Sequence, residues 1–499
     1  VMPQTRFVME KAISHGQRVI LVINKIDRPE QRVHEVADEV FDLLVELGAT
    51  DANLDFPIVY ASAKEGFACL EFEGPHENFL PLLDAILEHI PAPSCDPEGA
   101  GQFQAVTLGY DEYLGRMVIG RVMRGSLRRG EPVVRIGADG KQTNFRITKL
   151  FGTDGLERVE LEEAVAGDIV TIAGVDHIEV GDTVCHPSKI EALERINIDP
   201  PTLRVVFTVN TSPFAGQDGK FVTSRQVGDR LAREQLGNVA ISVSPGESGE
   251  SFEVAGRGEL QIGVLIETMR REGYEFAVGR PEIIMKDVDG VLSEPVEDVI
   301  ADIPEWASGA VIEKLNQRKA TMEGMETHGD RLNIHFTAPS RGLFGYRTQF
   351  LTDTRGEGIL HRTVCGYADH AGDLPSRSVG AVIASEGGQS TAYSIFKIQE
   401  RTTMFIGNAE KVYEGQIIGE ARKEGDMVVN IVRAKQLNNI RAAGKDDALI
   451  LTPARKPEIE TALGWIQEDE LLEITPKYLR LRKRELNEGL RKRISRAKG

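Results

Sequence analysis

The chain has 499 residues, of which 41% are hydrophobic and 27% are charged, and its formal net charge is -18. This length predicts about three to five globular domains. No apolar stretch approaches the roughly 20 residues of a transmembrane helix, and the charged start is unlike a signal peptide, so we predict a cytoplasmic protein without a membrane partner. Four widely separated cysteines argue against a disulfide framework or a zinc site, and we predict no metal ligands.

Two short apolar runs near the start each end in a polar signature. The first is V-I-L-V-I-N-K-I-D at Val19–Asp27, and the second is F-P-I-V-Y-A-S-A-K at Phe56–Lys64. Such runs are typical of parallel strands that are buried on both faces, and ligands bind at the carboxyl ends of these strands. Between the runs, apolar residues at helical spacing precede Gly48, which predicts a strand, helix, strand crossover. These residues are Val33, Val36, Val40, Leu43, Leu44 and Leu47.

The first signature, N-K-x-D, suggests guanine recognition. The carboxylate of Asp27 can accept hydrogen bonds from the N1–H and the 2-amino group of guanine, and adenine offers neither donor. We expect Asn24 to brace the loop and the alkyl stem of Lys25 to lie along the base. The motif is short, so it needs its structural context to carry weight.

The second signature, S-A-K, completes the predicted base site. We expect Ser62 to hold the turn, the backbone N–H of Ala63 to meet the 6-oxo group, and Lys64 to cover the other face of the base. A pair of ordinary surface loops is the alternative interpretation. The predicted guanine-binding set is Asn24, Lys25, Asp27, Ser62, Ala63 and Lys64.

Other parts of a nucleotide site are missing from the sequence. The chain contains no G-x-x-x-x-G-K-[ST] loop, and no D-x-x-G precedes the first strand. Nothing in it is therefore predicted to cradle phosphates or to hold Mg²⁺, and we predict no catalytic residue. We expect the chain to be the downstream part of a larger protein, beginning inside its nucleotide-binding domain.

The remaining sequence predicts a multidomain α/β and β protein. Glycine-punctuated β-rich runs predict a small closed barrel, and strands that alternate with amphipathic helices then predict two ferredoxin-like α+β domains. The helices are expected at 224–235, 259–271, 307–317 and 341–352. The predicted parts are 1–92 (the C-terminal half of a P-loop-type G domain), 98–196 (barrel), 200–288 and 289–372 (ferredoxin-like), and 373–499 (C-terminal domain).

The C-terminal end carries a strong positive charge. From Lys477 onward there are ten basic residues and two acidic ones. This asymmetry predicts that one end of an otherwise acidic chain binds a polyanion, and a solvated tail without a partner is the alternative.

Several longer segments resemble a known family. Glu253–Gly273 (E-V-A-G-R-G-E-L-Q-I-G-V-L-I-E-T-M-R-R-E-G) is similar to the third domain of elongation factor G, and Lys314–Glu326 resembles that factor's last domain, without the domain that separates them there. The segments Q-E-R-T-T-M-F-I, V-Y-E-G-Q-I-I-G-E, K-Q-L-N-N-I-R-A-A-G-K-D-D-A and E-I-T-P-K-Y-L-R-L-R-K-R resemble the C-terminal domain of the BipA/TypA family of translational GTPases. They begin at Gln399, Val412, Lys435 and Glu473.

The resemblance implies a cytoplasmic, monomeric GTPase that binds GTP or GDP with Mg²⁺, although the ligands for that ion are absent from this chain. It implies binding at the factor site of the large ribosomal subunit, a role in assembling that subunit and in growth under stress, and contacts with ribosomal RNA and A-site transfer RNA. The family's C-terminal loop reaches toward transfer RNA. The RNA-binding residues expected here are Arg433, Lys435, Arg441, Lys445, Arg482, Lys483 and Arg484.

Three alternatives share much of this architecture. A LepA-like elongation factor has the same body, although the C-terminal segments argue against it. The chain is also compatible with a ribosome-binding module without a nucleotide role, or with an RNA-assembly chaperone whose G domain is vestigial. Nucleotide affinity, and RNA remodelling with and without GTP, distinguish these alternatives.

Overall fold

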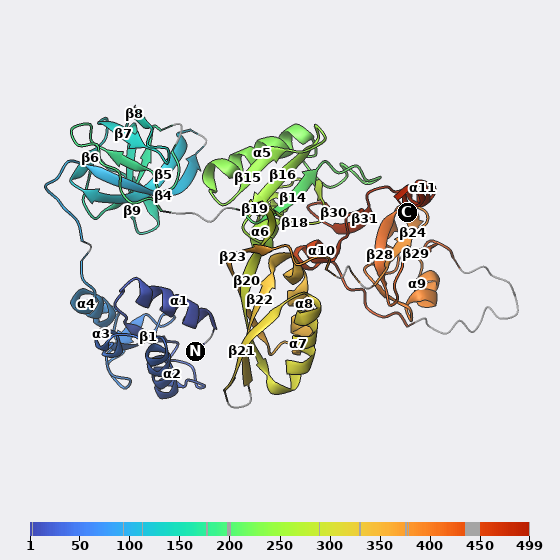
Figure 1. Ribbon diagram of the computed structural model, residues 1–499, viewed down its shortest axis with the longest axis horizontal. Coiled ribbons are helices and arrows are strands. Elements are labelled where there is room, and N and C mark those ends of the chain that lie inside the picture. The colour runs from blue at the N-terminus through green and yellow to red at the C-terminus, as the bar shows by residue number, and fades with distance from the viewer. Residues whose placement is uncertain are drawn as a thin grey trace, which may run out of the picture.

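The computed structural model describes residues 1, 3–92, 94–111, 113–175, 178–196, 201–288, 290–328, 331–374, 377, 379–434 and 450–498. Figure 1 shows the N-terminal α/β part and the barrel on one side, two α+β units in the middle and the C-terminal part on the other side. No helix in these ranges is both long enough and apolar enough to span a membrane.

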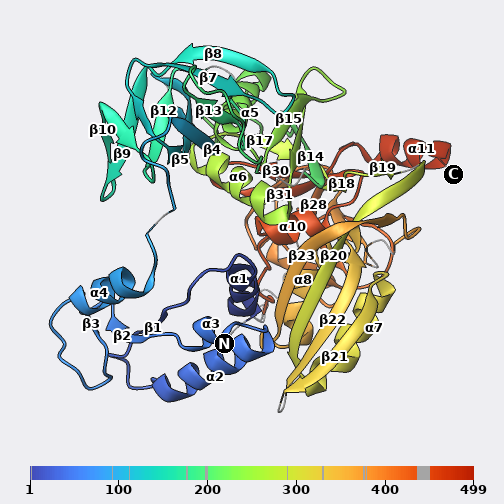
Figure 2. The same ribbon diagram turned by 60° about the vertical axis from the view of Figure 1, so that its left-hand side comes forward.

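The N-terminal part is a small α/β unit. Its elements are α1 (Pro3–Ser14), β1 (Leu21–Asn24), α2 (Val33–Glu46), α3 (Asp51–Leu54), β2 (Ile58–Ser62), β3 (Phe67–Cys69) and α4 (Leu80–His89). Strands β1 and β2 are parallel, and α2 connects them with its apolar side chains buried. Gly48 ends this crossover in the left-handed region at φ 67°. The predicted strand, helix, strand unit is confirmed, and α1 lies against the distant strand β23 (Ile359–Asp369) (Figure 2).

The second part is a β-barrel. Its main sheet has the order β10-β9-β12-β5-β4-β13-β7-β8, and β6 (Ser126–Arg128) pairs with β11 (Glu163–Val165). One apolar core contains side chains from both sheets, including Phe103, Leu127 and Ala164. The eight strands of the main sheet are β4 (Gln102–Asp111), β5 (Gly115–Arg124), β7 (Pro132–Ile136), β8 (Gln142–Arg146), β9 (Lys149–Asp154), β10 (Glu157–Glu160), β12 (Ile169–Ala173) and β13 (Thr183–Cys185).

The third part has the predicted ferredoxin-like order of elements. These are β14 (Leu203–Thr208), α5 (Ser224–Gly237), β15 (Ser242–Pro245), β16 (Ser251–Gly256), α6 (Glu259–Arg271) and β17 (Phe276–Val278). The strands lie in the order β15-β16-β14-β17. A capping box between Thr223 and Gln226 begins α5, and it satisfies backbone N–H groups that have no partner within the helix.

The fourth part repeats this arrangement with the strand order β21-β22-β20-β23. Its elements are β20 (Val291–Pro304), α7 (Ser308–Gln317), β21 (Thr321–His328), β22 (Arg331–Pro339), α8 (Tyr346–Asp353) and β23, preceded by β19 (Lys286–Val288). The helix predicted at 341–352 is instead broken into a 3₁₀ turn, Ser340–Leu343, and α8. Gly345 separates the two in the left-handed region at φ 64°, which a continuous helix does not allow.

The C-terminal part continues the sheet of the third part. Its main elements are β24 (Ala381–Ala384), α9 (Ala392–Ile398), β26 (Thr402–Met404), β28 (Gln416–Ala421), β29 (Met427–Val429), α10 (Ile459–Trp465), β30 (Glu470–Ile474), β31 (Leu479–Lys483) and α11 (Glu488–Lys498). Strand β17 pairs with β30 from Phe276↔Ile474 to Val278↔Leu472, and β31 then pairs with β28. Two segments that the sequence predicts as separate domains therefore share one sheet and one core.

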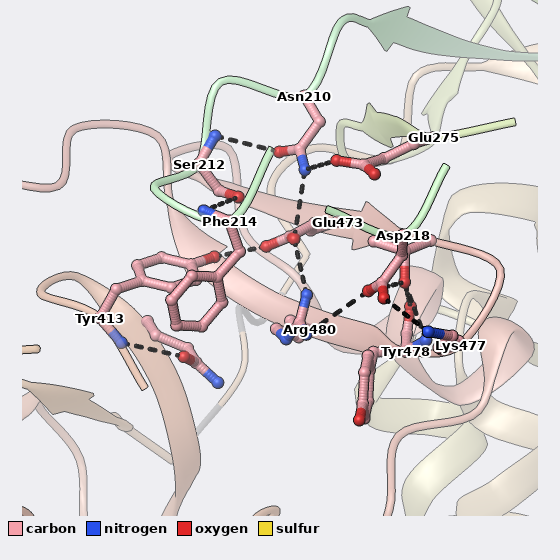
Figure 3. A network of polar contacts seen from close by, with 12 residues as sticks. Asn210, Ser212, Phe214, Asp218, Glu275, Tyr413, Glu473, Lys477, Tyr478 and Arg480 are labelled. Atoms are coloured by element: carbon pink, nitrogen blue, oxygen red, sulfur yellow. Dashed lines mark hydrogen bonds and ion pairs between the residues drawn. The ribbon is translucent and has the colours of Figure 1, made fainter. Parts of the chain in front are cut away.

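Buried polar groups lie at this junction (Figure 3). Both Glu275 and Glu473 are fully buried, and the side chain of Asn210 donates to each of them, at 2.8 and 3.2 Å. Glu473 also accepts from the Tyr413 hydroxyl at 2.6 Å and from Arg480 at 2.9 Å. Burial, together with the adjacent Glu473 charge, raises the pKa of Tyr413 well above its usual value, which keeps its hydroxyl available as a donor.

Replacing Glu473 by Ala should destabilise this junction by about 3 to 5 kcal/mol, because it leaves Arg480 and Tyr413 without a buried acceptor. The amides of β17 and β30 should lose protection together in hydrogen exchange, since the two strands belong to one ladder. Glu250→Ala, at an exposed position, is the control and should leave both strands protected. Loss of protection in β30 alone would show that the two segments are not coupled in this way.

Candidate functional site

The two polar signatures lie side by side. Asn24 ends β1 and Ser62 ends β2, and the parallel register places Asn24 opposite Ala61. The carboxyl ends of adjacent parallel strands therefore present both loops at the same edge of the sheet. In the following loop, the Ile26 N–H donates to the Ala61 carbonyl oxygen at 3.3 Å and links the two segments.

Asp27 is held by the second signature. The buried Ser62 hydroxyl donates to Oδ1 of Asp27 at 2.8 Å. This hydrogen bond is the main reason that the pKa of Asp27 lies below its ordinary value, and the charges of Lys64 and Arg28 act in the same direction. The carboxylate is exposed and retains acceptor positions, because each of its oxygens can accept more than one hydrogen bond. An ionised carboxylate in a fixed orientation suits a ligand with two adjacent N–H donors.

Asn24 joins the loops through its side chain. Its Oδ1 accepts from the Lys25 N–H at 2.8 Å and from the Ala63 N–H at 3.0 Å. Lys25 lies in the left-handed region at φ 67°, a conformation that costs free energy for a residue with a side chain. Asn24 braces the loops in the way expected of it. The Ala63 N–H, however, already donates to Asn24, so a bond from this amide to a 6-oxo group would have to share or replace that contact.

The two lysines of the predicted set, Lys25 and Lys64, are exposed beside Asp27. The structure thus brings all six predicted residues to one edge of the sheet. Sequence analysis missed Arg28, whose charge also lowers the pKa of Asp27. Its position directly after the first signature was the available signal.

No metal site accompanies these residues. Within the part of the chain that the structure describes, no group of three His, Cys, Asp or Glu side chains is placed to hold a metal ion. The described residues therefore offer no carboxylate set of this kind for Mg²⁺.

The predicted RNA-binding residues fall into three groups. Lys435, Arg441 and Lys445 lie outside the described residues. Arg433 is exposed, and its carbonyl oxygen accepts from the hydroxyls of Thr391 and Ser394 at 2.7 and 2.8 Å. Arg484 is also exposed, and its guanidinium donates to the Glu468 carbonyl oxygen at 3.4 Å.

The remaining two, Arg482 and Lys483, are buried, at 1% and 3% exposure. The Arg482 guanidinium donates to the Thr211 hydroxyl at 2.9 Å. The Lys483 ammonium forms ion pairs with Asp426, Asp469 and Glu470 at 2.7 to 2.9 Å. Their inward position argues against the predicted RNA contact at these two residues.

A separate cleft lies elsewhere. It has a volume of about 1280 Å³ between α6, α10 and the C-terminal strands, and none of the six predicted residues lines it. Basic groups such as Arg271 and Lys477 line it together with acidic groups such as Glu267 and Glu458. This balance of charges favours no particular ligand, so the cleft does not compete with the strand-end site.

Models of known families match most of the chain. Residues 1–92 match the elongation factor Tu GTP-binding domain, 115–185 match elongation factor Tu domain 2, 291–378 match the elongation factor G C-terminus, and 379–488 match the TypA/BipA C-terminal domain.

Curated relatives extend the match over nearly the whole chain. A protein of Escherichia coli strain K12 is 46% identical over 99% of this chain and 82% of its own length. Relatives from Bacillus subtilis strain 168 and a Synechocystis strain are 44% and 47% identical, over 100% and 97% of this chain and 82% and 81% of their own lengths. All three are named "Large ribosomal subunit assembly factor BipA". The chain belongs to the BipA family. A crystal structure of a protein from Thermus thermophilus aligns over 69% of each chain with 17% identity and a TM-score of 0.39.

Membership of the BipA family confirms the resemblance drawn from the C-terminal segments, and the GTP-binding match covers both strand-end signatures. The LepA-like alternative loses its support, because the match at residues 379–488 is specific to the TypA/BipA C-terminal domain.

Replacing Ser62 by Ala should raise the pKa of Asp27 toward its ordinary value, because it removes the hydrogen bond that lowers it most. In the unchanged protein, ionised Asp27 contributes its full stabilisation at pH values above the ordinary pKa of an aspartate. This contribution is lost as the pH falls through the lowered pKa of Asp27. NMR titration of the Asp27 carboxyl group measures the effect. Ser14→Ala, which removes a hydroxyl bonded to the Lys11 carbonyl oxygen, should leave the titration unchanged. An equal pKa in both variants would contradict the role assigned to Ser62.

Proposed function

We propose that the protein containing this chain is a GTPase that binds the large ribosomal subunit and serves in its assembly. The observation that carries the proposal is the pairing of Asp27 with Ser62 at the ends of two adjacent parallel strands. The chain that contains this pairing belongs to a family whose curated members are named for large-subunit assembly. The reaction is hydrolysis of GTP by water to GDP and phosphate.

The role of residues 1–92 is selection of the base. Asp27 accepts from the N1–H and 2-amino groups of guanine, and Ser62 and Asn24 hold the two loops in register. The stems of Lys25 and Lys64 cover the faces of the base. Adenine presents no pair of donors to the carboxylate. Binding of adenine would leave Asp27 without a partner, and the free-energy cost of this excludes adenine from the site. Bound Mg²⁺ would neutralise phosphate charge during hydrolysis, and this chain supplies no ligand set for it within its described residues.

The role of the C-terminal part is to contact RNA. Exposed Arg433 and Arg484, together with Lys435, Arg441 and Lys445 outside the described residues, provide cations for phosphate groups of ribosomal RNA and of A-site transfer RNA. The protein acts in the cytoplasm as a monomer at the factor site, and it supports growth under cold or other stress. Two other proposals predict no guanine specificity: a ribosome-binding module, and an RNA chaperone with a vestigial G domain. The Asp27 and Ser62 geometry favours the GTPase over both.

Asp27→Asn in the full-length protein should weaken GTP binding and favour xanthosine triphosphate. The side-chain amide loses an acceptor for guanine and gains a donor for the 2-oxo group of xanthine. We expect a loss of GTP affinity of at least about tenfold, measured by calorimetry with both nucleotides. Asp42→Asn, at an exposed position on α2, is the matched control. Equal affinity for GTP in the Asp27 variant and the unchanged protein would remove Asp27 from the site.

A protein limited to residues 1–499 should show no GTP turnover above background, with or without ribosomes. Its sequence has no G-x-x-x-x-G-K-[ST] loop to hold the β and γ phosphates. Release of phosphate, followed over several hours with purified ribosomes present, tests this expectation. Ribosome-stimulated turnover by this chain would show that other residues bind the phosphates.

A further inference from the structure

Two arginines have adjacent backbones at one end of a strand pair in the C-terminal part. Strands β26 and β28 are antiparallel, with Thr402 opposite Ala421, and the Arg422 N–H donates to the Arg401 carbonyl oxygen at 3.0 Å. Thr402 and Ala421 are buried. Arg401 directly precedes β26 and Arg422 directly follows β28, so the two lie just beyond the end of this ladder, and both side chains are exposed.

This arrangement is unfavourable within the protein itself. Like charges on residues whose backbones lie this close together repel one another. Across the described ranges, neither guanidinium forms a hydrogen bond or an ion pair. Glu420, the neighbouring acid on this strand, is instead paired with Arg455 at 2.5 Å. The two charges therefore remain available to an external anion.

Two lysines extend the positive surface. Lys397, near the end of α9, lies with its ammonium over the Tyr393 ring at 4.3 Å from the ring centroid. Lys423 directly follows the arginine pair, and its carbonyl oxygen accepts from the Gly380 N–H at 3.0 Å. Both lysine side chains are exposed. We call these four residues, Lys397, Arg401, Arg422 and Lys423, the strand-end basic patch.

The strand-end basic patch adjoins the base of the segment predicted to contact RNA. At the start of α9, Thr391 and Ser394 donate to the Arg433 carbonyl oxygen. After α9, Gln399 donates to the Ile450 carbonyl oxygen at 3.1 Å and accepts from the Thr452 N–H at 3.0 Å. The described chain therefore leaves near residue 433 beside the start of α9 and returns at residue 450 beside its end, where Lys397 and Arg401 lie.

We propose that the strand-end basic patch binds the sugar–phosphate backbone of ribosomal RNA in the large subunit. The arginine fork matches phosphate oxygens in a bidentate geometry, and phosphate contacts position a protein without reading sequence. The patch is thus a second RNA contact, separate from the segment at 435–449. This inference rests on the proposed function, because it assumes that the protein binds the large subunit.

The test uses the double variant Arg401→Gln with Arg422→Gln. Binding to purified large subunits, and to deproteinised large-subunit RNA, is measured across a range of salt concentrations. We expect affinity for both to fall on the order of tenfold, since hydrogen bonds to charged groups are lost. The slope of log affinity against log salt should flatten by about 1.4 to 1.8 if each arginine neutralises one phosphate. The melting temperature should change little, because both side chains are exposed and have no partner in the described chain.

The matched control is Arg493→Gln with Arg496→Gln on α11, where both residues are exposed. It changes the net charge equally in the same part of the chain and should retain most of the affinity. An equal loss of affinity in both double variants would show that net charge alone causes the effect, and it would overturn the proposal. So would unchanged affinity and slope in the Arg401 and Arg422 variant, or a loss with subunits but none with deproteinised RNA, which would identify a ribosomal protein as the partner. If the unchanged protein does not bind large subunits, the proposed function fails instead.

Discussion

The arrangement of the C-terminal half depends on the pairing of β17 with β30. This short ladder joins a ferredoxin-like unit to strands much later in the chain, and it places Glu275 and Glu473 in a region without solvent. Buried carboxylates are costly unless donors surround them. Asn210, Tyr413, Arg480 and the backbone amides of Gly216 and Gly219 supply those donors. The junction is therefore specified by polar contacts as well as by its apolar core, and the position of the C-terminal strands follows from it.

The same reasoning connects the junction to the proposed RNA contacts. Strand β31 passes from the shared sheet to β28 through Gln416↔Arg482 and Ile417↔Leu481, and β28 ends at the strand-end basic patch. Arg482 and Lys483 are buried along this path, where Lys483 pairs with carboxylates and Arg482 donates to the Thr211 hydroxyl. Their charges are thus used inside the protein, whereas Arg401 and Arg422 stay exposed at the end of the strand pair.

Sequence analysis predicted those elements whose signals are local. The helix at 259–271 was predicted to the residue, because its apolar spacing and the following Gly273 lie within one segment. The strand-end site was predicted because adjacent parallel strands must present their loops together. The β17 to β30 pairing was not predicted, since an apolar triplet such as Phe276–Val278 does not identify its partner. The break at Gly345 was missed because a glycine within a helical pattern is often tolerated.

The sequence predicted the helices and strands better than it predicted which charged side chains are exposed. Ten basic residues from Lys477 onward predicted a polyanion-binding tail, yet Arg480, Arg482 and Lys483 are engaged by neighbouring carboxylates or buried groups. Arg401 and Arg422, which are exposed and without a partner in the described chain, stand in a stretch where acidic residues mask them in any local count. Composition records how many charges a segment has, whereas only the pleat of the strands and the pairing of each carboxylate determine which charges face solvent. A basic segment therefore marks an RNA-binding surface only after its internal ion pairs have been subtracted, and here that subtraction removes Arg480, Arg482 and Lys483 from the basic end of the chain.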